Sequence, residues 1–366
     1  IAKRCPAGRP VEVSTREKCD RQPTQGSGKK VPKNSLVFLL REFAWNYGWW
    51  NKKTLLDWTD EFQPELILFQ AGDAGFLFRL TMKIAERYDI PIILYNTEGY
   101  YFKKKSYLHD SSVTNLLYPL LHRNYCKDYR ALMQKTALCI YNCDKLMQDY
   151  QKIFPQRAMV VMNASELADQ DLSDRVQEHR IVYAGNVGVG RYESIIAVAQ
   201  VAHKLDKTLY VYVYASISDA EVRSKLEACD GIRLMGYVSY EELQKVMLES
   251  EFLLSVENFN RFYCEDLKYA FSTKIADSLA SGNCLIVYAP KNIAVSQYLG
   301  GKQAALLITD PKDLEHALGE VLRDDSLRKE IAAAGRKLAV EHHSLRKNRA
   351  IFQKSIEVML DEGVTS

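Results

Sequence analysis

The sequence predicts an α/β protein made of two Rossmann-like, doubly wound domains that face each other across a cleft. Its 366 residues, 47% of them hydrophobic, are too many for one core and too few for three. Short, unbroken apolar runs alternate with helix-length segments, which is typical of parallel strands covered on both faces. Residues 164–179 are acidic and lack an apolar stripe, as expected of a connection between domains.

We therefore expect an N-terminal domain in residues 1–170, a C-terminal domain in residues 171–345 and a final amphipathic helix in residues 346–366. Residues 1–35 carry nine Lys or Arg against three acidic residues, with little periodicity. No apolar strand followed by a glycine turn is visible before Leu36. We expect the first strand of the N-terminal domain, and one phosphate-facing loop with it, to lie outside this numbering.

The apolar pattern locates the individual elements. Helices are expected within residues 36–62 and over residues 76–88, and the tryptophans of the first segment are expected in the core. These tryptophans are Trp45, Trp49, Trp50 and Trp58. The strands expected in the N-terminal domain are residues 66–69, 92–95, 137–141 and 159–162. Those expected in the C-terminal domain are residues 181–184, 209–214, 232–235, 252–255, 285–288 and 305–308.

Bulk composition narrows the function classes. The formal net charge of +3 gives no reason to expect nucleic-acid binding. The eight cysteines are scattered without a Cys-x-x-Cys pair, which favours reduced thiols in a cytoplasmic protein. No Cys/His pattern predicts a metal site, and no apolar run is long enough to cross a bilayer or to serve as a secretory signal.

The most informative segment is a predicted helix start that leads, through a Leu-Ala-Ser-Gly turn, into the apolar strand at residues 285–288. Ser272, Thr273 and Lys274 open this helix, so its positive end offers backbone N–H groups, two hydroxyls and an ammonium. Asp277 lies one turn further along the same face. These groups suit a diphosphate and a ribose, although a capped helix with a solvated lysine also explains the pattern.

A glycine-rich turn follows the strand at residues 181–184. Gly185 and Gly188 let backbone N–H groups approach a phosphate closely, and Arg191 beyond them can chelate two phosphate oxygens. The spacing differs from Gly-x-Gly-x-x-Gly and the turn lies in mid-chain, so we do not expect a nicotinamide site. A purely structural turn before a helix remains the alternative.

A third segment combines a turn with a helix cap. Ser239, with Glu242 at the third helical position, forms a capping box that a structural role explains fully. Only Gly236 and Val238, directly before the cap, keep a functional interpretation.

These three segments resemble the nucleotide-sugar signature of the retaining family-4 glycosyltransferases of the GT-B fold. The resemblance implies that Lys274, with Ser272 and Thr273, contacts the donor diphosphate and that Asp277 contacts its ribose. Members of the family often carry two glutamates eight residues apart, and here the first place falls on Tyr269.

The resemblance extends to the two other segments. Asn186 and Arg191 stand where the family contacts the donor phosphates, next to Gly185 and Gly188. Gly236 and Val238 stand where backbone groups bind the base, and the acids Glu265 and Asp266 are candidates to replace the missing glutamate. The final helix is implied to cross back to the N-terminal domain.

In the N-terminal domain, Asp73 and Glu98 each follow an expected strand and are therefore placed to face the cleft. Where the family often bears a His near the transferred sugar, this chain has Asn96 or Glu98. We select Glu98, with Arg191 and Lys274, as the candidate catalytic residues. Ordinary surface acids remain the alternative for the N-terminal pair.

Residues 100–135 interleave aromatics with seven Lys or Arg against two Asp. This composition suits anionic headgroups or a lipid diphosphate, and an ordinary solvated helix pair explains it slightly better. The segment is thus a candidate peripheral contact with the inner face of a membrane.

The resemblance implies transfer of a glycosyl group from a UDP- or GDP-linked sugar to an acceptor hydroxyl, with retention and without metal or other cofactor. The acceptor is expected to be a glycan or a lipid-linked glycan of surface polysaccharide or glycolipid assembly. A nucleotide-sugar 2-epimerase of the same fold and a non-catalytic nucleotide-sugar-binding partner subunit are the alternatives.

Overall fold

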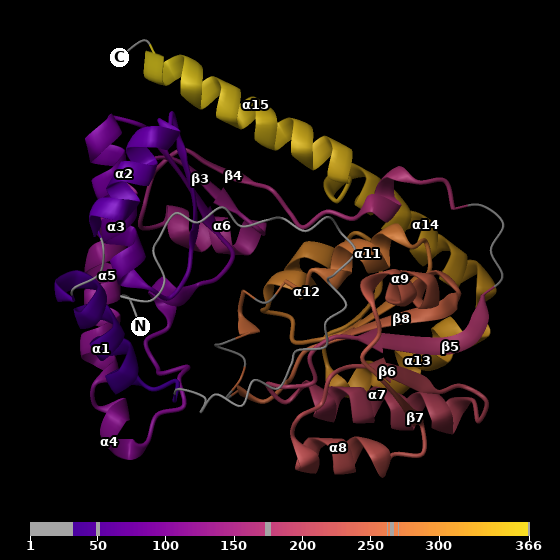
Figure 1. The fold of residues 1–366 in the computed structure, drawn as a ribbon. Coiled ribbons are helices and arrows are strands. Elements are labelled where there is room, and N and C mark those ends of the chain that lie inside the picture. Colours follow the sequence, from indigo (N-terminus) through magenta and orange to yellow (C-terminus); the bar gives the residue numbers. More distant parts are fainter. Residues whose placement is uncertain are drawn as a thin grey trace. The chain divides into compact units, whose positions relative to one another are not determined.

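The computed structural model describes residues 32–48, 52–172, 177–261, 263, 267–269 and 271–364. These residues form two compact units, each built around its own sheet (Figure 1). The first unit takes the described residues up to Tyr141, Asp149–Met159 and those from Ser355 onward, and the second takes Asn142–Gln148 and Val160–Lys354. The expected fold class, with two Rossmann-like α/β domains, is confirmed.

The first unit contains a four-stranded sheet whose strands follow in chain order, β1-β2-β3-β4. All four strands expected from the sequence are present: β1 (Ile67–Ala71), β2 (Ile92–Asn96), β3 (Thr136–Tyr141) and β4 (Ala158–Val160). The helical segments are α1 (Ser35–Tyr47), α2 (Lys52–Phe62), α3 (Gly75–Tyr88), η1 (Tyr100–Phe102), α4 (Ser112–Asn115) and α5 (Tyr118–Gln134). Two further helices, α6 (Asp144–Gln151) and α15 (Leu345–Val364), contribute residues to both units.

Tyrosines fill much of the core of the first unit. Because Tyr125 and Tyr129 are four residues apart on α5, both face inward, and both contact the ring of Phe78 from α3. Tyr129 is fully buried, and its hydroxyl donates to Oδ1 of Asn96 at 2.8 Å. Burial raises the pKa of Tyr129, so this hydroxyl stays neutral and fixes the carboxyl end of β2.

The expectation of core tryptophans was wrong for the two that the structure describes. Trp45 stacks on Phe76 with the ring centroids 4.7 Å apart, and Trp58 stacks on Phe62 at 5.6 Å, but each tryptophan is 40% exposed or more. Apolar side chains lie on more than one face of these helices, and Trp45 and Trp58 are on faces that do not meet the core. Trp49 and Trp50 lie outside the described residues, as do the acids Glu265 and Asp266.

The second unit contains a six-stranded sheet in the order β10-β9-β8-β5-β6-β7. Its strands again match the expected runs: β5 (Glu178–Ala184), β6 (Val211–Tyr214), β7 (Ile232–Gly236), β8 (Ser250–Val256), β9 (Cys284–Tyr288) and β10 (Leu306–Ile308). The helical segments that complete it are η2 (Glu166–Asp169), α7 (Arg191–Leu205), α8 (Ala220–Glu227), α9 (Tyr240–Leu248), α11 (Lys274–Ala280), α12 (Ala294–Leu299), η3 (Pro311–Asp313), α13 (Leu314–Arg323) and α14 (Asp325–His342). Figure 1 shows α9, α11 and α12 on one face of this sheet and α7 and α13 on the other.

The strand order of the second unit reverses at its centre. The chain winds from β5 through β6 to β7, then crosses to β8 on the other side of β5 and winds outward to β10. Open α/β sheets bind their ligands beyond the carboxyl ends of the strands at such a reversal. The ends of β5 and β8 therefore mark the place to search for a site.

The segment that leads into the second unit is bound to the end of α14. Ser165 donates its backbone N–H to the carbonyl of His343 at 2.8 Å, and Arg336 donates to the carbonyl of Leu167. The imidazole of His343 is completely buried between the carbonyl of Asn163 at 2.7 Å and the hydroxyl of Tyr298 at 3.0 Å. Burial lowers the pKa of His343 to about 4, so the ring is neutral at pH 7.

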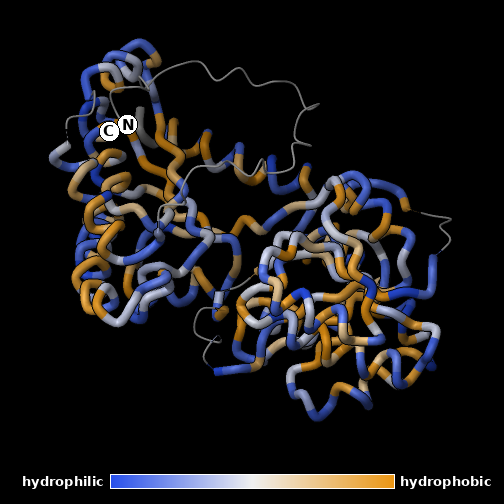
Figure 2. Tube along the Cα trace, turned by 60° about the horizontal axis from the view of Figure 1, so that its bottom comes forward, coloured by the Kyte–Doolittle hydropathy of each residue, from blue (hydrophilic) through white to orange (hydrophobic). Residues whose placement is uncertain are grey.

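Hydrophobic stretches run through the interior of the second unit, whereas in the first unit several of them also reach its outer margin (Figure 2). Among the described residues, no helix combines the length and hydropathy required to span a bilayer. The same residues contain no cluster of His, Cys, Asp and Glu arranged to hold a metal ion.

Candidate functional site

The glycine turn after β5 and the loop after β8 meet at the reversal of the second sheet. Arg191, the first residue of α7, donates from Nε to Oε2 of Glu257 at 2.7 Å and from Nη2 to Oε1 at 3.1 Å. This bidentate pair is largely buried, with 17% of the arginine side chain and 6% of the glutamate side chain exposed. Burial raises the pKa of Glu257 and the adjacent guanidinium opposes that shift.

The pair changes what Arg191 can offer a phosphate. Glu257 takes the N–H of Nε and one N–H of Nη2; among the described residues, Nη1 makes no hydrogen bond and is free for a ligand, together with the second N–H of Nη2. The hydroxyl of Ser194, one turn along α7, donates to the carbonyl of Glu257 at 2.8 Å and fixes the loop. The guanidinium is therefore held rigidly and presents one edge.

Gly190 ends the turn in a conformation that requires glycine. Its φ of +70° lies in the left-handed region, and a Cβ at this position would stand 2.0 Å from Nδ2 of Asn258. That amide donates to the carbonyl of Gly190 at 2.7 Å and to Glu193 at 3.0 Å. Asn186 is exposed, but its Oδ1 accepts the N–H of Gly188 at 2.7 Å, so its side chain braces the turn from within.

The predicted helix start at residue 274 exists as α11, which has seven residues. Ser272 and Thr273 are exposed and Lys274 is half-buried, whereas the rest of α11 is buried. The hydroxyl of Ser272 accepts the N–H of Lys274 at 3.3 Å, and Thr273 makes no side-chain cap bond. Two hydroxyls and an ammonium group therefore lie at the exposed start of α11, and the remaining residues of this helix are buried.

Asp277 lies one turn further along, 6% exposed. Its Oδ1 accepts from the hydroxyl of Ser165 at 2.6 Å and from that of Tyr240 at 3.1 Å. Burial raises the pKa of Asp277, while the hydrogen bonds from Ser165 and Tyr240 and the charge of Lys274 oppose the shift. Among the described residues, Oδ2 makes no hydrogen bond and is the oxygen that remains available to a ligand.

The third predicted segment adjoins this carboxylate. Gly236 ends β7 with a φ of +79°, Val238 is half-buried, and Ser239 caps α9 by accepting the N–H of Glu242 at 3.2 Å. Tyr240, the first residue of α9, then reaches Asp277. The structure thus links the loop expected at the base with the carboxylate expected at the ribose. Among the described residues, no side chain bonds to both Lys274 and Arg191, so no hydrogen bond links the start of α11 to the glycine turn.

In the first unit, the expected acids lie where β1 and β2 end. Asp73 is paired with Arg41, whose Nη1 lies 3.3 Å from Oδ1 and whose Nη2 donates to the Asp73 carbonyl at 2.9 Å. Glu98 is exposed, and its Oε2 lies 3.8 Å from Nζ of Lys103.

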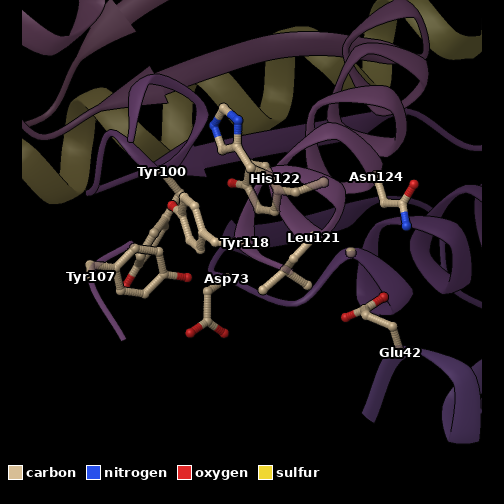
Figure 3. A pocket seen from close by; sticks show the side chains of 10 residues that line it. Glu42, Asp73, Tyr100, Tyr107, Tyr118, Leu121, His122 and Asn124 are labelled. Carbon is tan, nitrogen blue, oxygen red and sulfur yellow. The ribbon is translucent and has the colours of Figure 1, made fainter. Parts of the chain in front are cut away.

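Asp73 also lines a narrow pocket. Figure 3 shows Tyr100 and Tyr107 beside Asp73 on one side of this pocket and Glu42 on another. Burial raises the pKa of Tyr100 to about 12, so its hydroxyl is neutral. The free space within the pocket accommodates little more than water, so a larger molecule could reach only its mouth.

Sequence reasoning missed Glu257, Asn258, Ser165 and Tyr240. The first two directly follow the apolar run of β8, and a polar residue at a strand end is the signal that flagged Asp73 and Glu98. Their role required knowing that β8 lies beside β5. Ser165 is 112 residues from Asp277, and no local pattern connects the two.

Residues 191–352 match the model of a protein family described as glycosyl transferase-like. No curated protein matches the chain in sequence. The match covers less than half of the chain and includes α7, α11 and the loop after β8.

Solved structures share the fold. A TarM mutant from S. aureus, solved with fondaparinux, alpha-GlcNAc-glycerol and UDP, has a TM-score of 0.57 at 12% identity, and the match covers 84% of this chain and 58% of that one. The pneumococcal O-GlcNAc transferase GtfA, in complex with UDP and GlcNAc, has a TM-score of 0.60 at 14% identity, with 85% and 60% covered. A putative UDP-N-acetylglucosamine 2-epimerase from Listeria monocytogenes has a TM-score of 0.54 at 9% identity, with 85% and 78% covered.

The fold class defined by these likenesses is GT-B. The chain spans about three fifths of the length of the TarM and GtfA chains. At these identities the structural likeness shows the fold alone. The family match adds a glycosyl transferase-like sequence over residues 191–352, all within the second unit.

Proposed function

We propose that this chain transfers a sugar from a nucleoside-diphosphate sugar, UDP- or GDP-linked, to an acceptor hydroxyl with retention of configuration. The observation that carries the proposal is the site at the reversal of the second sheet, where a glycine turn and a rigid Arg191 adjoin the end of β5. The exposed start of α11 adds Lys274 on the same unit.

In this proposal the donor diphosphate is held by Nη1 of Arg191, the N–H groups of the glycine turn, and Lys274 with Ser272 and Thr273. Positive charge at the departing diphosphate stabilises the charge that develops as the glycosyl bond breaks, so no metal is needed. Asp277 binds the ribose through Oδ2, and the backbone at Gly236 and Val238 contacts the base. The donor phosphate itself helps to take the proton of the acceptor hydroxyl.

Calorimetry with UDP, GDP and ADP tests the donor site. Lys274→Ala is expected to weaken binding by about 10- to 100-fold, the loss of one charge-assisted contact. Lys245→Ala is the matched control, since that lysine is exposed on α9 and pairs loosely with Glu249. If Lys274→Ala bound each nucleotide as tightly as the parent protein, the assignment of the diphosphate to α11 would fail.

A nucleotide-sugar 2-epimerase is the second candidate, because one structure of similar fold carries that description. Incubation of the chain with a UDP-sugar separates the two: slow hydrolysis without acceptor supports the transferase, and isomerisation of the sugar supports the epimerase. A chain that binds UDP without turnover of any donor would be a non-catalytic subunit.

The acceptor is proposed to be a glycan or lipid-linked glycan of surface polysaccharide or glycolipid assembly, bound at the carboxyl ends of β1 and β2. Glu98 and the mouth of the tyrosine-lined pocket are its proposed contacts. Glu98→Gln is then expected to lower the rate of transfer while UDP affinity stays the same. A change in UDP affinity with unchanged transfer would contradict the role given to Glu98.

We further propose a cytoplasmic location with peripheral contact to the inner face of a membrane through residues 100–135. Lys104, Lys105, Arg123 and Lys127 in this segment are all exposed. Co-sedimentation with vesicles of anionic lipid, but not with zwitterionic vesicles, is the expected result. If the chain binds neither kind of vesicle, this proposal fails, and the proposed donor site is not affected.

A further inference from the structure

The outward face of α1 is apolar and its charges point inward. Leu36, Leu40, Phe43 and Tyr47 are 45%, 57%, 63% and 72% exposed, and they define what we call the α1 stripe. The helix is described along its whole length, and its only charged residues, Arg41 and Glu42, are turned toward the rest of the unit. A surface helix normally has the opposite arrangement.

The inward contacts hold α1 firmly in this orientation. Arg41 lies over the ring of Phe38 at 4.1 Å and pairs with Asp73, and Glu42 accepts from Arg79 at 2.8 Å. Asn34 caps the helix by accepting the N–H of Val37 at 3.0 Å. Rotation that buried the stripe would break this network, so the apolar face stays outward.

We propose that the α1 stripe is the interface of a homodimer, in which α1 of one copy packs against α1 of a second copy. The spacing of the stripe, four, three and four residues, is the spacing by which two helices interlock their side chains along one seam. A stripe without charge can face its own copy without repulsion. The proposal does not depend on the donor chemistry.

The exposed area is consistent with a reversible dimer. At their observed exposures the four side chains leave on the order of 500 Å² of apolar surface, comparable to the largest patch on a typical monomer. Two such stripes would bury about 1000 Å² in total, near the lower limit for a specific interface. The rings of Phe43 and Tyr47 are 5.1 Å apart, and aromatic side chains are enriched at such interfaces.

A membrane suits the α1 stripe less well than a second helix does. Interfacial helices carry Lys or Arg along the flanks of their apolar face, whereas the one cation of α1, which is described in full, is Arg41, which is 28% exposed and paired with Asp73. The exposed cations of this unit lie outside α1: Lys33 precedes it, and others lie on α2, α3, α5 and the segment before α5. The two surfaces therefore allow separate tests.

Sedimentation velocity of the full chain over about 1 to 100 µM tests the dimer, since an interface near the lower size limit is expected to dissociate in that range. The parent protein is expected to shift from monomer to dimer with concentration. Leu40→Glu and Phe43→Glu are each expected to raise the dissociation constant at least about 30-fold, as loss of a central interface residue does. Both side chains are more than half exposed, so the fold tolerates the change, which circular dichroism verifies.

Leu116→Glu is the matched control, because Leu116 is a 78% exposed leucine outside α1. It is expected to leave the dimer intact. A parent protein that stays monomeric throughout would overturn the proposal, and so would a dimer that Leu116→Glu disrupts and Phe43→Glu does not. Binding of a monomer to anionic vesicles that Phe43→Glu abolishes would assign the α1 stripe to a membrane and equally refute the dimer.

Discussion

The sharpest prediction about the proposed donor site concerns the pair formed by Arg191 and Glu257. Substituting one partner shows how the charge of the other affects UDP binding. Arg191→Ala removes the proposed phosphate donor at Nη1 and also leaves the Glu257 side chain, 6% exposed, without its cation. An unpaired negative charge then stands where a diphosphate is expected. The single substitution should therefore weaken UDP binding by more than the loss of one contact.

The structure gives the scale of each effect. One charge-assisted hydrogen bond is worth about 1.5–3 kcal/mol, so its loss weakens binding by about 10- to 150-fold. Repulsion by Glu257 adds to this in Arg191→Ala. In the double variant Arg191→Ala/Glu257→Gln that repulsion is absent, so affinity should recover by about 10-fold relative to Arg191→Ala.

The measurement is a double-mutant cycle of UDP affinity by calorimetry, with near-UV circular dichroism to verify that each variant is folded. Arg223 and Glu227 provide a matched control pair, since they lie four residues apart on the exposed face of α8 with their charges 3.8 Å apart. The same substitutions there should not change UDP affinity. Equal affinities for Arg191→Ala and the double variant would refute the argument about Glu257, and parent-like affinity for Arg191→Ala would refute the phosphate contact itself.

Three further predictions follow from the second unit. In the folded protein the pKa of His343 is about 4, against an ordinary value of 6.5, so as the pH falls His343 is protonated in the unfolded chain before it is protonated in the folded one. The free energy of unfolding should therefore decrease by about 3 kcal/mol between pH 6.5 and pH 4. Urea unfolding across this range, compared with His343→Gln, measures the effect, and equal pH slopes would contradict it. Ser165→Ala removes a donor to Asp277 and should lower the free energy of unfolding by about 1–2 kcal/mol, whereas an unchanged denaturation midpoint would show that this bond is dispensable. Treatment with EDTA should leave UDP binding unchanged if Arg191 and Lys274 neutralise the diphosphate, and recovery of binding only on adding Mg²⁺ would show otherwise.

Much of the fold was predictable because it depends on local pattern. All ten expected strands appear within a few residues of their predicted bounds, since a parallel strand buried on both faces is a short apolar run. The helix start at Lys274, the glycine turn and the cap at Ser239 were likewise local features. Each depends on residues only a few positions apart in the chain.

The expectations that failed or were incomplete concern faces and partners. The tryptophans of α1 and α2 are exposed because their helices turn other side chains toward the body of the unit. Asn186 braces its own turn, and Asp277 is bonded to residues 112 and 37 positions away. A local sequence pattern does not show which distant residue a side chain will bond to.

The amino-acid sequence by itself determined the α/β class, the strands and the candidate residues for binding a diphosphate, because each of these depends on residues that are close together in the chain. Only the tertiary structure decided that β8 lies next to β5, and hence that Glu257 holds Arg191 through Nε and Nη2. It also decided that α1 turns its charges inward and Leu36 and Leu40 outward. The physical reason is that an ion pair between distant residues, or the exposure of one face of a helix, depends on segments far apart in the chain. These segments contact each other, and contribute to stability, only in the folded protein.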